Sequence, residues 1–165
     1  MDHLNGDSDD DVMRMVEILD KDTCSAPKIR DLLLRHQFKY VGNSGEFEDY
    51  IDSKTGLQFG LRLVDIGVKV ETAIGLGKEI DLKNKHRILN LINFKSPLSV
   101  HQIRYFEGEN MNGLISSYEF PIYPEPMGYH ADWLALGITK FCESTKLVHE
   151  NISALLKSDY DLTPE

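Results

Sequence analysis

Residues 129–157 read YHADWLALGITKFCESTKLVHENISALLK and carry the clearest periodic pattern in the chain. Apolar positions recur there at alternating spacings of four and three residues, the period of one face of an α-helix. They are Leu134, Ile138, Phe141, Thr145, Val148, Ile152 and Leu155. At 1.5 Å per residue this helix is roughly 43 Å long, comparable with the width of a domain of this size. Because only three heptads are present and Thr145 interrupts them, packing across a sheet is favoured over a coiled coil.

The sheet that this helix would cover is predicted from residue 57 onward. Apolar and polar residues alternate over 57–63 and again over 68–74, with a short turn at residues 65–67, which is the pattern of a half-buried antiparallel hairpin. Two further strands are predicted at 100–107 and 114–122, joined by a polar, glycine-rich loop. We expect all four strands to share one sheet.

Further elements precede and separate these strands. Helices are predicted at 10–20, at 25–37 behind the Ser25-Ala-Pro27 start signal, and at 82–93. Turn chemistry marks residues 42–46 and 53–56, on either side of a strand at Tyr50-Ile51. The resulting order α-α-β-β-β-α-β-β-α, with a long C-terminal helix, predicts an α+β fold in which helices cover an antiparallel sheet.

The chain of 165 residues is long enough for one domain, and its charges gather at its two ends. Of its 27 acids, five lie in residues 1–11 and three in 158–165, where there is no Lys or Arg, leaving 19 acids beside 18 bases in between. We therefore predict an acidic extension with a short amphipathic helix over 1–24, one domain over 25–157 and an acidic tail over 158–165.

Composition and charge exclude several classes of protein. The body is nearly neutral, whereas a nucleic-acid-binding domain would present a basic face to the phosphates. No apolar run approaches the length of a bilayer span, and the first eleven residues do not resemble a secretory signal, so a cytoplasmic protein without a membrane partner is expected. Cys24 and Cys142 are isolated and are expected to be buried thiols.

No motif of an enzyme or of a cofactor site is complete. The stretch Gly75–Glu79 lacks the spacing and the hydroxyl of a phosphate-binding loop, and no two histidines stand four residues apart to form a helical metal site. We therefore expect a protein without catalytic, metal or cofactor residues. One alternative stays open: a small hydrolase or nuclease that assembles its site from distant positions, with Asp65, Glu71 and His101 as candidates.

Aromatic residues gather around the second hairpin and are the candidate partner-binding residues. They are Tyr105, Phe106, Tyr118, Phe120 and Trp133. Tyr105 and Phe106 are adjacent, so a strand sends them to opposite faces, where they either meet a core on both sides or form an exposed patch. An open sheet edge nearby would bind another polypeptide by strand addition.

The element order also resembles a known family. A helix over 27–37, strands, a helix that ends in Ile88-Leu-Asn-Leu-Ile-Asn93, a hairpin with Tyr118-Glu-Phe-Pro-Ile122 and a long last helix are similar to the YbjN family, whose fold is shared by class I type III secretion chaperones. The resemblance covers 25–157 and implies a non-enzymatic protein that binds another protein or peptide in a regulatory or chaperone role. A dimeric secretion chaperone is the alternative, and a homodimer is possible in either case.

Overall fold

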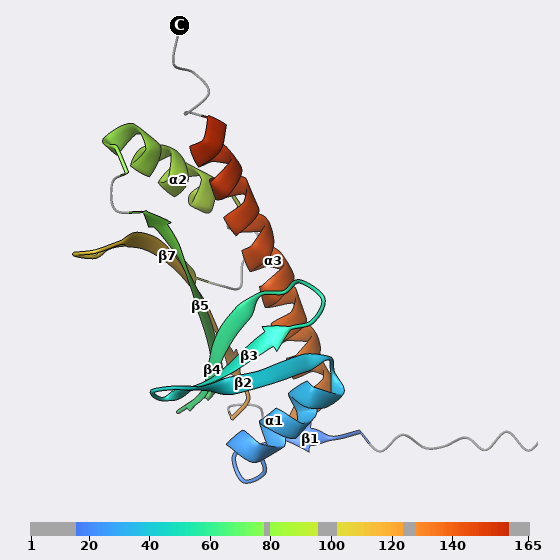
Figure 1. The fold of residues 1–165 in the computed structure, drawn as a ribbon. Helices are drawn as coiled ribbons and strands as arrows, with labels where there is room; N and C mark the ends of the chain where they lie inside the picture. Colours follow the sequence, from blue (N-terminus) through green and yellow to red (C-terminus); the bar gives the residue numbers. More distant parts are fainter. Residues whose placement is uncertain (1–15, 78–79, 96–101, 124–127, 159–165) are drawn as a thin grey trace, which may run out of the picture.

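The structure is a computed structural model that describes residues 16–77, 80–95, 102–123 and 128–158 (Figure 1). Three helices and eight strands are found in these residues. In chain order they are β1 (Ile18–Leu19), α1 (Ala26–Arg35), β2 (Phe38–Ser44), β3 (Phe47–Asp52), β4 (Gln58–Val64), β5 (Gly67–Gly77), α2 (Leu82–Lys95), β6 (Gln102–Glu107), β7 (Asn112–Pro121), β8 (Tyr129–His130) and α3 (Ala131–Ser158). The predicted α+β class and the long C-terminal helix are confirmed.

Six of the strands form one antiparallel sheet in the order β2-β3-β4-β5-β7-β6. The predicted strands at 57–63, 68–74, 100–107 and 114–122 therefore do share a sheet, with residues 100 and 101 lying outside the described part. In Figure 1, α3 runs along the sheet, with α1 near one end of α3 and α2 near the other. Packing of α3 across a sheet is thus confirmed.

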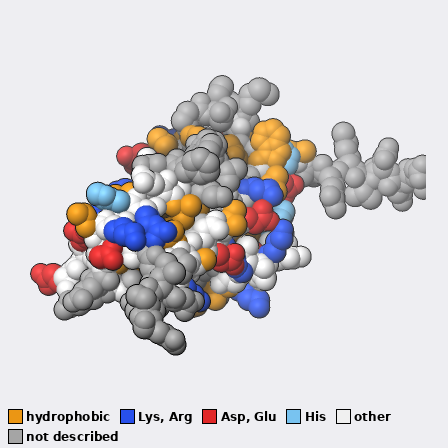
Figure 2. All heavy atoms as spheres, turned by 90° about the horizontal axis from the view of Figure 1, so that it is seen from above, with side chains coloured by type: hydrophobic (Ala, Val, Ile, Leu, Met, Phe, Trp, Pro, Cys, Tyr) orange, Lys and Arg blue, Asp and Glu red, His pale blue; other side chains and the backbone are white. Residues whose placement is uncertain are grey.

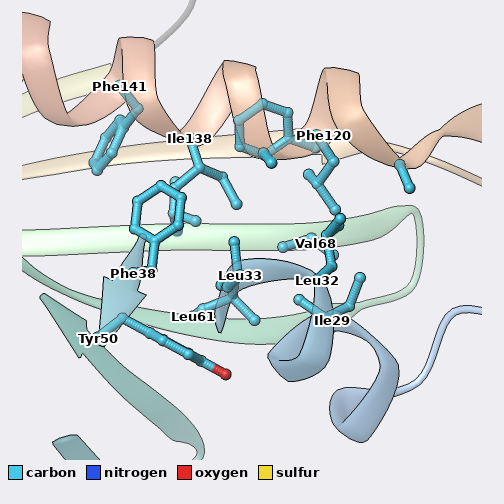
Figure 3. Close-up of a cluster of buried hydrophobic side chains, with 14 of the residues drawn as sticks. Ile29, Leu32, Leu33, Phe38, Tyr50, Leu61, Val68, Phe120, Ile138 and Phe141 are labelled. Atoms are coloured by element: carbon cyan, nitrogen blue, oxygen red, sulfur yellow. The ribbon is translucent and has the colours of Figure 1, made fainter. Parts of the chain in front are cut away.

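All three helices pack on the same face of this sheet. Residues paired across neighbouring strands point to one face, and the pairs Leu61–Val70 and Val68–Phe120 mark the face toward the helices. Helix α1 buries Ile29, Leu32 and Leu33 against them, together with the first half of α3 (Figure 3). The apolar spacing of both helices is therefore satisfied by one cluster, which we call the larger cluster.

A second, smaller cluster of buried side chains lies under α2 and the last half of α3. It contains Ile88, Ile92, Leu114, Val148 and Ile152, with Ile74, Ile103 and Tyr105 partly buried against it. Between the two clusters, β5, β7 and α3 each carry a hydroxyl instead of an apolar side chain: Thr72, Ser116 and Thr145. Thr72 and Ser116 are directly paired across β5 and β7. We call these three residues the hydroxyl seam.

Two expectations about the N-terminal third are wrong. Residues 42–44, expected in a turn, belong to β2, and the turn itself is confined to Gly45 and Glu46. The predicted helix at 10–20 is replaced at Ile18–Leu19 by strand β1, and its first part lies outside the described residues. The remaining expected turns, at 53–56 and 65–67, are found between β3, β4 and β5.

Strand β1 ties the start of the described chain to the start of α3. It pairs with β8 in the register Ile18–His130 and Leu19–Tyr129, and the Ala131 amide donates to the Glu17 carbonyl. Leu19 is apolar because it is fully buried in the larger cluster as a strand residue, and not because it lies on the apolar face of a helix. Tertiary pairing overrides the local 3.6-residue period here.

Candidate functional site

The five aromatic residues singled out in the sequence do not form a single patch. Phe120 is only 3% exposed and belongs to the larger cluster, and Tyr118 packs edge-on against it with ring centroids 4.4 Å apart. Trp133 lies on α3 and is 64% exposed, stacked on His130 at 5.4 Å. Tyr118 and Phe120 both belong to β7, and Tyr105 and Phe106 both belong to the neighbouring strand β6.

Tyr105 and Phe106 point to opposite faces of the sheet, as predicted. Tyr105 is paired with Leu114 on the helix face, where it packs on the smaller cluster with the Lys85 ammonium 5.4 Å from its ring centroid. Phe106 is paired with Gly113 on the other face. A Cβ atom at residue 113 would lie 2.6 Å from the Phe106 ring, so glycine is what allows the ring to lie flat over β7.

Strand β6 is the last strand of the sheet and pairs with β7 alone among the described strands. Its register runs without interruption from Gln102 to Glu107. The strand at the opposite edge, β2, is different, because its register shifts between Tyr40 and Gly42. A bulge of this kind bends an edge and disfavours further pairing, whereas the regular β6 edge is suited to it.

Beside β6, the sheet face opposite the helices, which we call the open face, is hollowed. The hollow has a volume of about 510 Å³ and is lined by Ile66, Lys69, Gln102, Arg104, Ser117, Tyr118 and Glu119. Arg104 is exposed on β6 and is directly paired with Ile115 of β7. Among the described residues, no carboxylate forms an ion pair with the guanidinium of Arg104.

Elsewhere on the open face, paired charges lie beside the aromatic ring of Phe47. Lys69 lies 3.2 Å from Glu71 and Arg62 lies 3.1 Å from Glu46, so these charges neutralise one another. Arg62 also lies over the ring of Phe47, 5.2 Å from its centroid. Such a surface is typical of an antiparallel sheet with one side in water. Seen from above, the end of the molecule also mixes acidic, basic and apolar side chains (Figure 2).

Of the residues named for the alternative hydrolase or nuclease, the two that the structure describes, Asp65 and Glu71, do not converge. Asp65 lies in the exposed turn between β4 and β5. Glu71 lies in the middle of β5, about 14 Å along the strand from its first residue, and forms an ion pair with Lys69. His101 lies outside the described residues. Within the described part of the chain, no three His, Cys, Asp or Glu side chains are grouped as a metal site, and no helix is long and apolar enough to cross a membrane.

The perturbed pKa values of Cys142 and Glu48 have structural causes, burial for the first and bonding partners for the second. Burial raises the pKa of the Cys142 thiol, which is fully enclosed, as the sequence predicted for both cysteines. Burial also tends to raise the pKa of Glu48, but the guanidinium of Arg30 and the hydroxyl of Tyr50 outweigh it and lower that pKa. Because Arg30 belongs to α1 and Glu48 to β3, this group fastens the helix to the sheet.

Comparison with known proteins supports the fold. No family model matches the sequence, and no curated protein matches it. Among solved structures, the chain is similar to YbjN from E. coli, described as a proposed transcription regulator, with a TM-score of 0.61 and 10% identical residues. The match covers 80% of this chain and 93% of YbjN. At this identity, the comparison establishes that the chain has a YbjN-like fold.

Proposed function

We propose that this protein is a non-catalytic, cytoplasmic polypeptide-binding module that takes up an extended segment of another protein along the outer edge of β6. The observation that carries the proposal is the uninterrupted register of β6 combined with its position at the end of the sheet. The role would be regulatory or chaperone-like, in keeping with the YbjN-like fold and with the description of YbjN as a proposed regulator.

The physical basis is strand addition. An edge strand presents backbone N–H and C=O groups that have no partner within its own sheet, and an extended segment satisfies them while its alternate side chains contact the two faces. On the helix face of β6 the segment would meet Ile103 and Tyr105, which are only partly buried. On the open face it would meet Arg104 and Phe106. Main-chain bonds thus supply affinity and these four side chains supply selectivity.

Mapping of amide hydrogen exchange tests the proposal. Full-length protein is used under native conditions to capture a partner, and exchange is then measured on the purified chain with and without the captured protein. We expect slower exchange over residues 102–107 and unchanged exchange over 38–44, the bulged edge. Protection confined to β2 or to α3, or turnover of a small molecule with no retained protein, would contradict the proposal.

Sedimentation velocity, together with amide exchange on the pure protein, separates a homodimer from a complex with another protein. Two copies joined at β6 would double the mass in sedimentation velocity as concentration rises, and would protect residues 102–107 in the pure protein. That result would assign the edge to a second copy, as a dimeric chaperone requires. A chain that stays monomeric and becomes protected only when partner is added supports the module proposed above.

A further inference from the structure

Two lysines near β6 are neutralised by ion pairs, whereas Arg104 on β6 itself has none among the described residues. Lys85 is paired with Glu107 on the helix face, and Lys69 is paired with Glu71 on the open face. Arg104 has an exposed side chain and no ion pair among the described residues. It also stands third of six residues in β6, near the middle of the strand, where an added segment would lie directly beside it.

The side chains on either side of Arg104 along the strand are apolar. Ile103 and Tyr105 point to the helix face and pack on the smaller cluster, while Arg104 points to the open face beside Ile115. The edge therefore offers an apolar, a cationic and an apolar position in succession, with the cation on one face and the apolar side chains on the other. Neighbouring strands place paired residues on the same face, about 5 Å apart.

We propose that the segment bound at β6 has an apolar–acidic–apolar core, with its carboxylate beside Arg104 and its two apolar residues beside Ile103 and Tyr105. This inference rests on the proposed function and specifies the partner's chemistry. The apolar residues would extend the smaller cluster, and the carboxylate would neutralise the single unpaired cation of this edge. A lysine in place of the acid would face Arg104 as a like charge, which is destabilising for directly paired positions.

Two short synthetic peptides test the inference on the full-length chain. Both carry a fluorescent label and blocked ends, and both are rich in Thr and Val, but one has Val-Glu-Val at its centre and the other Val-Lys-Val. Affinities are measured by fluorescence anisotropy at low salt, where exposed charge pairs are least screened. We expect the wild-type protein to bind the glutamate peptide about three- to tenfold more tightly than the lysine peptide.

Charge reversal supplies the decisive variant and its control. Arg104→Glu should reverse the preference in favour of the lysine peptide. Lys39→Glu makes the same change on an exposed residue of the other edge strand, β2, and should leave the preference as in the wild type. An equal preference in the wild type and in Arg104→Glu would overturn the inference.

Failure of the inference and failure of the proposed function give different results. If both peptides bind the wild type equally and slow amide exchange over 102–107, the edge binds extended segments without reading charge, and only the inference is lost. If neither peptide binds and exchange over 102–107 is unaffected at millimolar peptide, the edge does not accept an added strand, and both proposals fail.

Discussion

Replacing Thr145 by valine should make the protein more stable, although the change removes a polar group from a helix. Thr145 is fully buried between the two clusters, and its hydroxyl has no hydrogen-bond partner among the described residues. A buried polar group without a partner costs about 1–3 kcal/mol. Valine has nearly the same shape and a similar helix propensity, so it removes this cost without opening a cavity.

The expected gain is about 1 kcal/mol, which corresponds to a rise of about 2–4 °C in the melting temperature of a chain of this length. Thermal unfolding followed by circular dichroism, with chemical denaturation as a second measurement, would resolve a shift of this size.

Thr139 offers a matched control on the same helix. Its hydroxyl donates to the Ala135 carbonyl at 3.1 Å and is half-buried, so Thr139→Val loses a hydrogen bond and should be neutral or destabilising by up to about 1 kcal/mol. The two valine variants should therefore shift stability in opposite directions. A Thr145→Val variant that is less stable than the wild type would show that this hydroxyl is hydrogen-bonded in the folded protein.

Two further predictions concern a turn and an ion pair. Gly67→Ala should lower the free energy of unfolding, measured by chemical denaturation, by about 2–4 kcal/mol, because a Cβ atom there would lie 2.2 Å from a backbone oxygen. Gly56 also has a positive φ but has open space around it, so Gly56→Ala should cost only about 1 kcal/mol. Equal losses in the two variants would contradict this reasoning. Hydrogen bonds from Lys140 and Lys54 lower the pKa of Glu143 to about 2, below its ordinary value of 4.5, so its stabilising effect is present above pH 4.5 and is lost as pH falls toward 2. Glu143→Gln should therefore flatten the melting temperature against pH between these values, and an unchanged slope would show that the ion pair does not form in solution.

The sequence predicted best those elements whose pattern and tertiary environment agree. Helix α3 keeps its seven-position stripe because one side of it lies on the sheet along both clusters. Tyr105 and Phe106 were correctly sent to opposite faces because strand geometry alone requires it. The sequence could not predict which of the two faces of the sheet is covered by helices, because that depends on where all three helices pack.

The elements that sequence reasoning missed are held by pairing instead of by pattern. Strand β2 is rich in polar and glycine residues, and the bulge at Val41 breaks its alternation, so residues 42–44 read as a turn. Strands β1 and β8 have two residues each and exist only because they pair with each other. The sequence also could not show that Arg104 lacks an ion pair among the described residues while Lys69 and Lys85 have one, because ion pairs depend on the tertiary structure.

The position of β6 links binding at this edge to the stability of the protein's smaller cluster. Ile103 and Tyr105 are the outermost members of that cluster on the sheet, and the hydroxyl seam separates it from the larger one. A segment that adds apolar side chains beside them enlarges the smaller cluster without altering the larger. A ligand that binds a part of the protein only when that part is folded stabilises the folded form by mass action. If a partner binds at this edge, we therefore expect it to stabilise the smaller cluster more than the larger one.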